Sequence, residues 1–332
     1  IASASATWSP RRFWVLDGHR NDAGDAVLPA TGTFDLAWTA GIAWAQTSTI
    51  ALRDLYFLAP LELTGGEPHR VRLTIEADGA FVLESQPENG PVMSWTEHAT
   101  GRVDTHAAAS DQRNLSFTGE DLNALRMRCK DVRQHTVTDR LQQEKYLRFG
   151  PEWRCLQEIR YGERESIAEL ELDPVFASEL EDYVLHPALL DMAMSFGLPL
   201  LSDYGEKDFY VPMSCDNFAG CRPLPQRVTS VIQLRDDATQ DVAAFDIALF
   251  DEDGEPLSLA EGPLLPEWTG NYAGRPGESY AKVLRDEWSG EVPSAAYWRD
   301  VTLVSDNRIA AHETAKTHYA FEAPNEGTLT VK

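Results

Sequence analysis

Two ionisable side chains stand far apart in the chain, each within a distinctive local sequence. His19 ends the run Trp14–His19, and Asp191 ends the run His186–Asp191. A neutral imidazole can act as a general base, and a carboxyl group that an apolar site keeps protonated can act as a general acid. Acting on neighbouring carbons, this pair would take a proton from one carbon and protonate the hydroxyl that leaves the other. The two residue types therefore suit the β-elimination of water.

The elements that must position these residues follow a repeated order. Large apolar side chains at helical spacing predict a buried helix over 33–45, and a second buried helix is predicted over about 187–199. Alternating and apolar runs around each helix predict strands, with Asp78-Gly79 and Asp253-Gly254 as hairpin turns. The predicted strands are 50–58, 70–76, 80–85, 92–103, 153–160, 165–172, 209–221, 227–236 and 242–250. The pattern predicts an α+β fold in which each of two halves wraps an antiparallel sheet around one helix.

The same pattern divides the chain into three segments. Residues 104–125 lose the periodicity, which is typical of a linker. We therefore predict an N-terminal half over 1–125 that carries His19, and a C-terminal half over 126–268 that carries Asp191. Composition changes after Trp268, and residues 269–332 form an extension with strand-like pieces and no predicted role.

Composition restricts the class of protein and its partners. Hydrophobic residues make up 43% of the 332 residues, enough for a sizeable core, and the net charge of −24 disfavours nucleic acid and anionic membranes as partners. Apolar runs stay well short of the roughly 20 residues that span a bilayer, and no signal peptide is recognisable. The chain starts at Ile1 without Met, so we expect it to be excised from something longer or processed. Four cysteines without Cys-x-x-Cys spacing indicate reduced thiols and a cytoplasmic protein.

Four motifs, in order along the chain, resemble those of the dehydratase domains of modular polyketide synthases. The stretch from His19 through Gly24 to Pro29 is similar to the family's His-x-x-x-Gly-x-x-x-x-Pro motif, with one extra residue before the glycine. Phe149–Trp153 is similar to Tyr-Gly-Pro-x-Phe and contains Gly150 and Pro151. His186–Asp191 matches His-Pro-Ala-Leu-Leu-Asp in full and includes Pro187, and Val211–Met213 is similar to Leu-Pro-Phe. The resemblance covers about residues 13–268.

This chain departs from the family pattern at three further positions. Phe149 replaces a tyrosine whose hydroxyl borders the site in the family, and Met213 replaces an aromatic residue. Ser195 stands four residues after Asp191, where the family commonly has Gln or His in contact with the aspartate. Because of these departures, the resemblance does not fix the range of substrates or a secondary activity. The two residues expected to be catalytic, His19 and Asp191, are both retained.

The resemblance implies a double hotdog fold, in which two antiparallel sheets each wrap a central helix and share one active site. It implies the removal of water from a 3-hydroxyacyl thioester on the phosphopantetheine arm of an acyl carrier protein, giving a 2-enoyl thioester. The implied partners are the carrier protein, the neighbouring domains of a megasynthase and, as often in the family, a second copy of the chain. No metal or redox cofactor is expected. Two alternatives are a dehydratase-like double-bond isomerase or oxygen-heterocycle-forming cyclase, and a non-catalytic scaffolding module.

In this interpretation His19 is the base and Asp191 the acid. Backbone N–H groups near Gly24 and the N-terminus of the 33–45 helix are candidate donors to the thioester oxygen. Burial would keep Asp191 protonated, whereas its place in the first turns of a helix favours the ionised form, so the sequence leaves its protonation open. An alternative leaves Asp191 to orient the hydroxyl or a water while His19 carries the proton. His186 is expected to cap the helix or bond to backbone.

Basic residues gather between 126 and 148 in an otherwise acidic chain. Arg126, Arg128 and Arg133 lie in this stretch, together with Lys130, Arg140, Lys145 and Arg148. One hypothesis is that the stretch docks the acidic carrier protein, because the overall negative charge would otherwise slow that encounter. A solvated, charged helix is an equally weighted alternative.

Overall fold

The computed structural model describes fourteen separate stretches of the chain. They are residues 2–47, 50–90, 95–106, 122–136, 139, 142–202, 204, 210–219, 222–236, 238, 243–266, 302–305, 319–323 and 327–331. Cys221, Arg140 and most of the predicted linker lie outside the described residues, as does most of the 269–332 extension.

The N-terminal half wraps five antiparallel strands around one long helix. The helix, α2 (Ala30–Ala45), is buried at every position from Thr31 to Thr39, so it forms the centre of this half. The strands pair in the order β1-β6-β7-β8-β4. Their bounds are β1 Ala2–Trp8, β4 Ala51–Phe57, β6 His69–Ile75, β7 Ala80–Pro87 and β8 Thr96–Asp104. The turn between β6 and β7 contains Gly79 at φ +87, where a Cβ would lie 2.3 Å from the Val103 carbonyl oxygen.

The C-terminal half repeats this plan around a shorter helix, α4 (Pro187–Ser195). Its strands pair in the order β14-β17-β16-β15-β12-β11-β9, with β13 paired to β17. Their bounds are β9 Asp131–Gln134, β11 Leu156–Tyr161, β12 Glu165–Glu171, β13 Tyr210–Pro212, β14 Ser214–Ala219, β15 Arg227–Leu234, β16 Ala243–Phe250 and β17 Pro256–Pro266. The helix α3 (Leu122–Arg128) contributes Leu125 to a small separate core with Ile167 and Val231.

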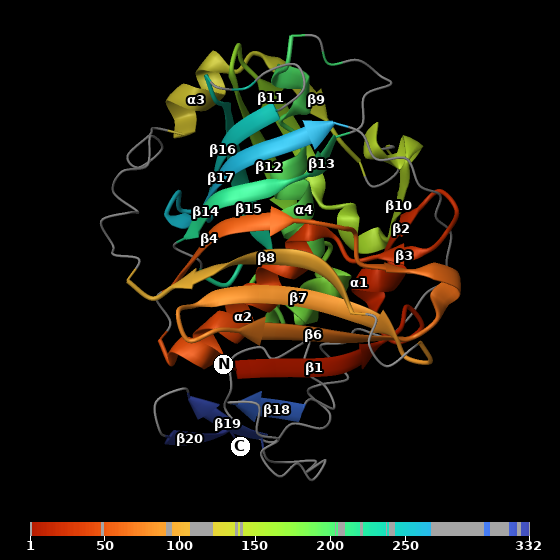
Figure 1. Cartoon of the computed structure of the whole chain (residues 1–332). Coiled ribbons are helices and arrows are strands. Elements are labelled where there is room, and N and C mark those ends of the chain that lie inside the picture. Colours follow the sequence, from red (N-terminus) through yellow and green to blue (C-terminus); the bar gives the residue numbers. More distant parts are fainter. Residues whose placement is uncertain are drawn as a thin grey trace.

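The two halves share one continuous sheet. Strands β4 and β14 pair antiparallel, with Leu52 opposite Phe218, so thirteen described strands of the two halves, together with β18 of the extension, form a single 14-stranded sheet. Figure 1 shows this sheet running from the red and orange strands of the first half into the green and blue strands of the second. The figure also shows α2 and α4 close together, and the two helices are in contact. The fold is therefore the expected double hotdog, with the two sheets joined edge to edge.

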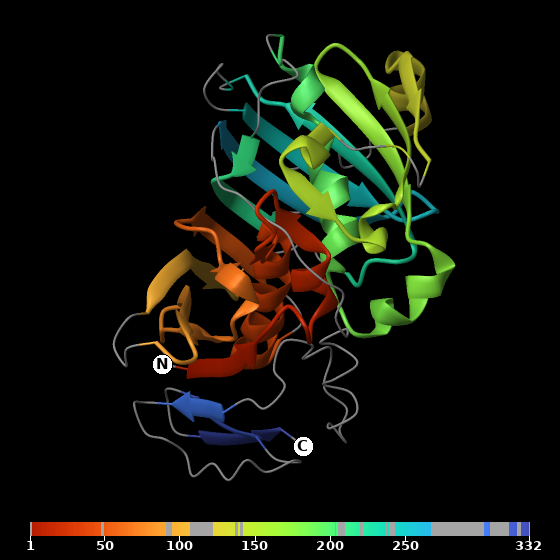
Figure 2. The same ribbon diagram turned by 90° about the vertical axis from the view of Figure 1, so that its right-hand side faces the viewer.

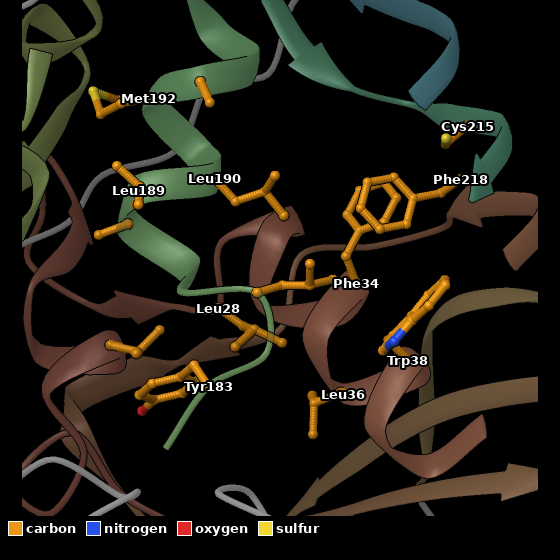
Figure 3. Close-up of a cluster of buried hydrophobic side chains, with 14 of the residues drawn as sticks. Leu28, Phe34, Leu36, Trp38, Tyr183, Leu189, Leu190, Met192, Cys215 and Phe218 are labelled. Carbon is orange, nitrogen blue, oxygen red and sulfur yellow. The ribbon is translucent and has the colours of Figure 1, made fainter. Parts of the chain in front are cut away.

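The main core lies where the two helices meet the seam of the sheet. Figure 3 shows Leu28, Phe34 and Trp38 from the first half beside Leu190 and Phe218 from the second. The rings of Phe34 and Phe218 have centroids 4.7 Å apart. A buried side chain of this kind contributes roughly 1.5–3 kcal/mol, so this shared core holds the halves together.

A second, small sheet crosses from one half to the other. It pairs the strands in the order β10-β2-β3-β5. Their bounds are β2 His19–Asn21, β3 Ala26–Val27, β5 Glu62–Leu63 and β10 Leu147–Phe149. Strand β10 comes from the second half and places Phe149 opposite His19. Figure 2 shows this region from the side, where segments of both halves lie against each other.

The remaining described elements are short helices and a C-terminal addition. The short helices are α1 Trp14–Asp17, η1 Thr64–Gly66, η3 Gln142–Lys145, η4 Pro151–Trp153, η5 Pro174–Glu181 and η6 Leu198–Leu200. In the extension, β18 (Thr302–Ser305) pairs with β1, and β19 (Tyr319–Ala323) pairs with β20 (Gly327–Val331). The proposed border between 125 and 126 falls inside α3, and the division into three segments stays a prediction.

Both predicted central helices are confirmed, with shifted ends. The first begins at Ala30 rather than 33, and the second ends at Ser195, before the separate turn η6. Strands β1 and β17 were not predicted from the sequence. The alternation in β1 is between alanine and serine, both poor strand formers, and β17 contains Gly262 and Pro263, which usually interrupt strands.

Candidate active site

His19 is held by its own backbone segment in a defined tautomer. Its Nδ1 lies 3.0 Å from the Val27 carbonyl oxygen. A carbonyl oxygen only accepts hydrogen bonds, so Nδ1 carries the proton and Nε2 keeps its lone pair. The side chain is nearly buried, and this burial lowers the pKa of His19 below its usual 6.5. His19 is therefore a neutral imidazole with a basic nitrogen available for proton transfer.

Asp191 lies in the second turn of α4 and is fixed by a residue from another element. The Trp153 indole Nε1–H donates to Oδ2 of Asp191 over 2.7 Å. Burial raises the pKa of Asp191 above its usual 3.8, while the charge of His19 and the Trp153 hydrogen bond lower it. Burial has the larger effect, so the pKa of Asp191 is raised and the environment favours the protonated carboxyl group more than water would.

The two groups act on each other across the border between the halves. The charge of Asp191 raises the pKa of His19 against the effect of burial, and the charge of His19 lowers the pKa of Asp191. Trp153, which is 0% exposed, contacts both, since its ring centroid lies 5.8 Å from that of His19. The structure thus brings together the two residues that the sequence analysis selected, although 172 positions separate them (191 − 19).

Phe149, Gly150 and Pro151 hold this aromatic contact in place. The Phe149 ring lies 5.6 Å from His19 and stacks on Trp153 at 5.9 Å. The Gly150 N–H donates to the Gly18 carbonyl over 2.6 Å, and a Cβ at position 150 would lie 3.0 Å from the Gly18 Cα. Pro151 then begins η4, which carries Trp153. The motif lets the backbones of the two halves approach closely enough to align the site.

His186 and Pro187 begin α4. Pro187 is its first residue, and His186 Nδ1 accepts the Leu189 N–H over 3.3 Å, which is the capping role expected from the sequence. Its Nδ1 is therefore unprotonated, and Nε2 carries the hydrogen that faces Glu179 Oε2 at 3.3 Å. Burial lowers the pKa of His186 to about 3. His186 is a neutral cap that sets the start of the helix carrying Asp191.

The Gly24 backbone is already engaged, which corrects the expectation that its N–H serves the thioester oxygen. Gly24 has φ +103, and its N–H donates to the Asn21 side-chain oxygen over 3.1 Å. Its carbonyl accepts from Arg20 over 3.0 Å. Asn21 thereby shapes the turn that returns the chain towards Val27. Pro29 is the N-cap residue of α2 and offers no side-chain cap, so the helix N-terminus stays a candidate donor.

Ser195 and Met213 have no hydrogen bond to His19 or Asp191 among the described residues. The Ser195 carbonyl accepts from Gln143 over 3.4 Å, and the hydrogen bond to the Asp191 carboxyl comes from Trp153. The Met213 side chain is 40% exposed at the seam of the sheet, where its carbonyl accepts from the Phe57 N–H. Roles for these two residues in substrate positioning stay predictions.

The three arginines of the basic stretch that were singled out for docking are paired with acidic residues. Arg126 pairs with Glu169, Arg128 with Glu165 and Arg133 with Asp131. Arg133 also lies 4.6 Å from the Tyr161 ring centroid. This agrees with the charged-helix interpretation for the side chains of Arg126 and Arg128, and a carrier protein would have to compete with these partners.

Trp153 is the functional residue that the sequence analysis missed. It occupies the last position of the Phe149–Trp153 motif, so its place in the chain was noted but its contact with Asp191 was not. Within the described residues, no group of three or more His, Cys, Asp or Glu side chains is arranged to hold a metal ion. No helix in the described part of the chain has the length and apolar character to cross a membrane.

Two protein-family models match the two halves. The model of the polyketide synthase dehydratase domain matches residues 3–86, and that of the polyketide synthase dehydratase N-terminal domain matches residues 118–264. Polyketide synthase GfsB of Streptomyces halstedii is 32% identical over 180 residues, which are 52% of this chain and 3% of GfsB. The chain thus spans only a small part of this much longer relative.

Solved dehydratase domains share the fold. The dehydratase domain from the CurF module of curacin polyketide synthase has a TM-score of 0.66 and 20% identity, over 80% of this chain and 93% of that domain. Two inactive mutants of CurK dehydratase, one with a histidine replaced by phenylalanine and one with an aspartate replaced by asparagine, both have TM-scores of 0.65. Their identities are 19% and 20%, and they cover 81% and 80% of this chain and 94% of each solved chain. By its two family matches, which span well over half of its length, this chain belongs to the polyketide synthase dehydratase domains.

Proposed function

We propose that this chain removes water from a 3-hydroxyacyl thioester carried by an acyl carrier protein and gives a 2-enoyl thioester. The observation that carries the proposal is the pairing of His19, whose Nδ1–H bond to Val27 leaves Nε2 unprotonated, with a buried Asp191 whose pKa burial raises. The reaction needs one proton acceptor and one proton donor at neighbouring carbons, and these two groups supply them.

In the proposed reaction His19 Nε2 takes a proton from the carbon next to the thioester carbonyl. The carbon–oxygen bond at the β-carbon breaks, and Asp191 gives its proton to the departing hydroxyl, which leaves as water. His19 is then protonated and Asp191 ionised, a state that their mutual attraction favours. Transfer of the proton from His19 back to Asp191, through the released water, restores the starting state.

Charge that develops on the thioester oxygen needs preorganised donors. The Val27 segment that orients His19 leads within two residues to Pro29, the N-cap of α2. The positive end of that helix therefore follows two residues after the carbonyl that orients the base, and no side chain caps it. This supports the N-terminus of α2, rather than Gly24, as the stabilising group.

The inactive mutants of CurK dehydratase agree with a catalytic histidine and aspartate in that protein. Because this chain has the same fold and retains both residue types in the corresponding motifs, His19 and Asp191 are proposed to have those roles here. The carrier protein and the neighbouring domains of a megasynthase follow from the same proposal.

The direct experiment mixes the protein with a panel of 3-hydroxyacyl pantetheine thioesters and follows the products by mass spectrometry and ultraviolet absorbance. Loss of one water with the appearance of a conjugated enoyl thioester is expected, and His19→Phe and Asp191→Asn should each abolish it. If the only product carries a shifted double bond or a closed oxygen ring, the activity is that of the isomerase or the cyclase and dehydration is not the function. Absence of turnover with every thioester, including carrier-bound ones, would contradict the proposal.

A further inference from the structure

We propose that Trp153 is a positioning residue that decides which oxygen of Asp191 delivers the proton. The indole Nε1–H occupies Oδ2, and the transferable proton is thereby assigned to Oδ1. The inference rests on the proposed function, in which Asp191 is the proton donor. It adds a residue outside the acid–base pair and gives the last position of the Phe149–Trp153 motif a chemical role.

The geometry follows from hydrogen-bond chemistry. An indole nitrogen only donates, so the oxygen that receives it must act as an acceptor. In a protonated carboxyl group one oxygen carries the hydrogen and the other is the better acceptor. The Trp153–Asp191 distance of 2.7 Å to Oδ2 therefore places the acidic hydrogen on Oδ1. Without this donor the proton would be free to reside on either oxygen, and the carboxyl group would lose the hydrogen bond that orients it.

Trp153 is held rigidly enough to impose this choice. Its side chain is 0% exposed and is packed by three rings, with centroid distances of 5.9 Å to Phe149, 5.8 Å to His19 and 5.7 Å to Trp14. Its segment is tied to the first half by the Gly150 N–H bond to the Gly18 carbonyl. One five-residue stretch thus contacts the base through Phe149 and the acid through Trp153.

The hydrogen-bond donor to the Asp191 carboxyl group comes from η4, and the helix α4 that carries Asp191 does not provide one. Ser195 stands four residues after Asp191, on the same face of the helix, and its side chain is short. A longer amide side chain at this position would be able to reach the carboxyl group from the next turn. The indole of Trp153 fills that role here from a different element.

The hydrogen bond also acts on the acidity of Asp191. It lowers the pKa of the carboxyl group, against the larger effect of burial. The other titratable groups that interact with Asp191 are His19 on β2 and the buried thiol of Cys155, which lies between η4 and β11. Glu152, the carboxylate on η4, interacts with Glu179 and Asp17 instead. Removal of the indole donor should therefore raise the pKa of Asp191.

The test compares Trp153→Phe with Trp38→Phe. Both are buried tryptophans, and the Trp38 indole nitrogen has no hydrogen-bond partner among the described residues, so Trp38→Phe removes the same atoms away from the site. Trp153→Phe should lower kcat about 10- to 100-fold, the effect of losing a hydrogen bond to an ionisable group. In Trp153→Phe the alkaline limb of the kcat–pH profile should move to higher pH, because Asp191 with a higher pKa stays protonated up to a higher pH. Trp38→Phe should change thermal stability without moving that limb.

A rescue variant separates positioning from packing. Adding Ser195→Gln to Trp153→Phe supplies an amide donor from the next turn of α4, and we expect it to recover part of kcat and return the alkaline limb towards the wild-type pH. A Trp153→Phe protein with wild-type kcat and pH profile would overturn the inference. Loss of kcat with an unmoved limb and no rescue would assign Trp153 to packing only and would overturn it too.

A measurement on the unmodified protein keeps the inference testable if Trp153→Phe does not fold. In protein labelled with ¹⁵N at its indoles, one signal should titrate with the pH of the alkaline limb and shift in Asp191→Asn. Indole signals that all stay unchanged across this range would contradict the Trp153–Asp191 bond in solution. This readout does not need turnover. A protein inactive on every thioester would end the proposed function, whereas a static indole signal would end the inference alone.

Discussion

The two halves of the molecule each place a histidine near the start of a central helix, and they use it in opposite tautomers. His19, ahead of α2, donates through Nδ1 to the Val27 carbonyl, so its Nε2 is a base. His186, ahead of α4, accepts through Nδ1 from the Leu189 N–H, so its Nε2 carries the hydrogen towards Glu179. Both are buried and neutral. The partner of one ring nitrogen therefore decides whether the histidine performs chemistry or caps a helix.

The central helices show a parallel contrast between two aspartates. Asp35 on α2 is 0% exposed and accepts the Leu185 N–H over 2.9 Å, which joins the first half to the segment before His186. Asp191 on α4 accepts from an indole and interacts with the base. The same residue type on two similar elements is structural in one half and, in the proposed function, the proton donor in the other, because its partners differ.

The largest expected effect tests the contrast between the two histidines. His19→Ala should lower kcat for water loss by about 10²–10⁴-fold, the usual contribution of a general base, while the protein stays folded. His186→Asn keeps a side-chain oxygen for the Leu189 N–H, so it should cost far less activity. Steady-state kinetics with a 3-hydroxyacyl thioester measure both. Unchanged turnover in His19→Ala would remove the base assignment.

The next effect concerns the carboxyl group that faces His186. Burial, with a smaller effect of Asp182, raises the pKa of Glu179 to about 8 from its usual 4.5. Between these values the folded protein binds more protons than the unfolded chain, so stability should fall as pH rises from about 4.5 to about 8. The loss should be on the order of a few kcal/mol, since one pKa unit corresponds to about 1.4 kcal/mol.

Glu179→Gln removes this titration and keeps an oxygen for the His186 Nε2–H. Urea unfolding at several pH values should show a flatter profile for Glu179→Gln and higher stability than wild type at pH 8. Glu181→Gln, an exposed residue two positions along η5, is the matched control and should leave the profile as it is. A wild-type protein whose stability rises over this pH range would be inconsistent with a neutral Glu179.

A smaller effect separates the two aspartates. Asp35→Ala leaves the buried Leu185 N–H without its acceptor and should destabilise the fold by about 1–3 kcal/mol. Asp35→Asn retains an acceptor oxygen and should cost less. Asp191→Asn should instead abolish turnover with little change in the midpoint of urea unfolding. Equal stability losses at the two positions would break the division into structural and chemical aspartates.

The smallest effect concerns the arginines proposed to dock the carrier protein. Reversing the charge of Arg126, Arg128 and Arg133 breaks exposed or partly exposed ion pairs, each worth at most about 1 kcal/mol. If the stretch docks a carrier, KM should rise for carrier-bound substrate and stay constant for a pantetheine thioester. Equal KM changes for both substrates would discard docking at this surface.

The sequence predicted those features that depend on local pattern. Helical spacing of apolar residues located both central helices, and the His186–Asp191 run located the proposed acid and the residue that caps its helix. It did not predict β1, whose small alternating residues give a weak strand signal, or β17, whose interior contains glycine and proline. It also named backbone N–H groups near Gly24 as candidate donors to the thioester oxygen. The bond of the Gly24 N–H to the Asn21 side chain is visible only once the turn is formed.

The sequence by itself determined which residue types are present and on which elements most of them lie, since periodicity and motif spacing are properties of neighbouring residues. Only the tertiary structure decided how these residues act. The pairing of β10 with β2 brings Phe149 to His19, and the packing of η4 against α4 brings Trp153 to Asp191. The protonation of His19 depends on burial and on Asp191, which is more than 100 residues away. The tautomers of His19 and His186 depend on hydrogen-bond partners only a few residues away. The contacts of His19 with Phe149 and Trp153 exist only after the two halves have packed together.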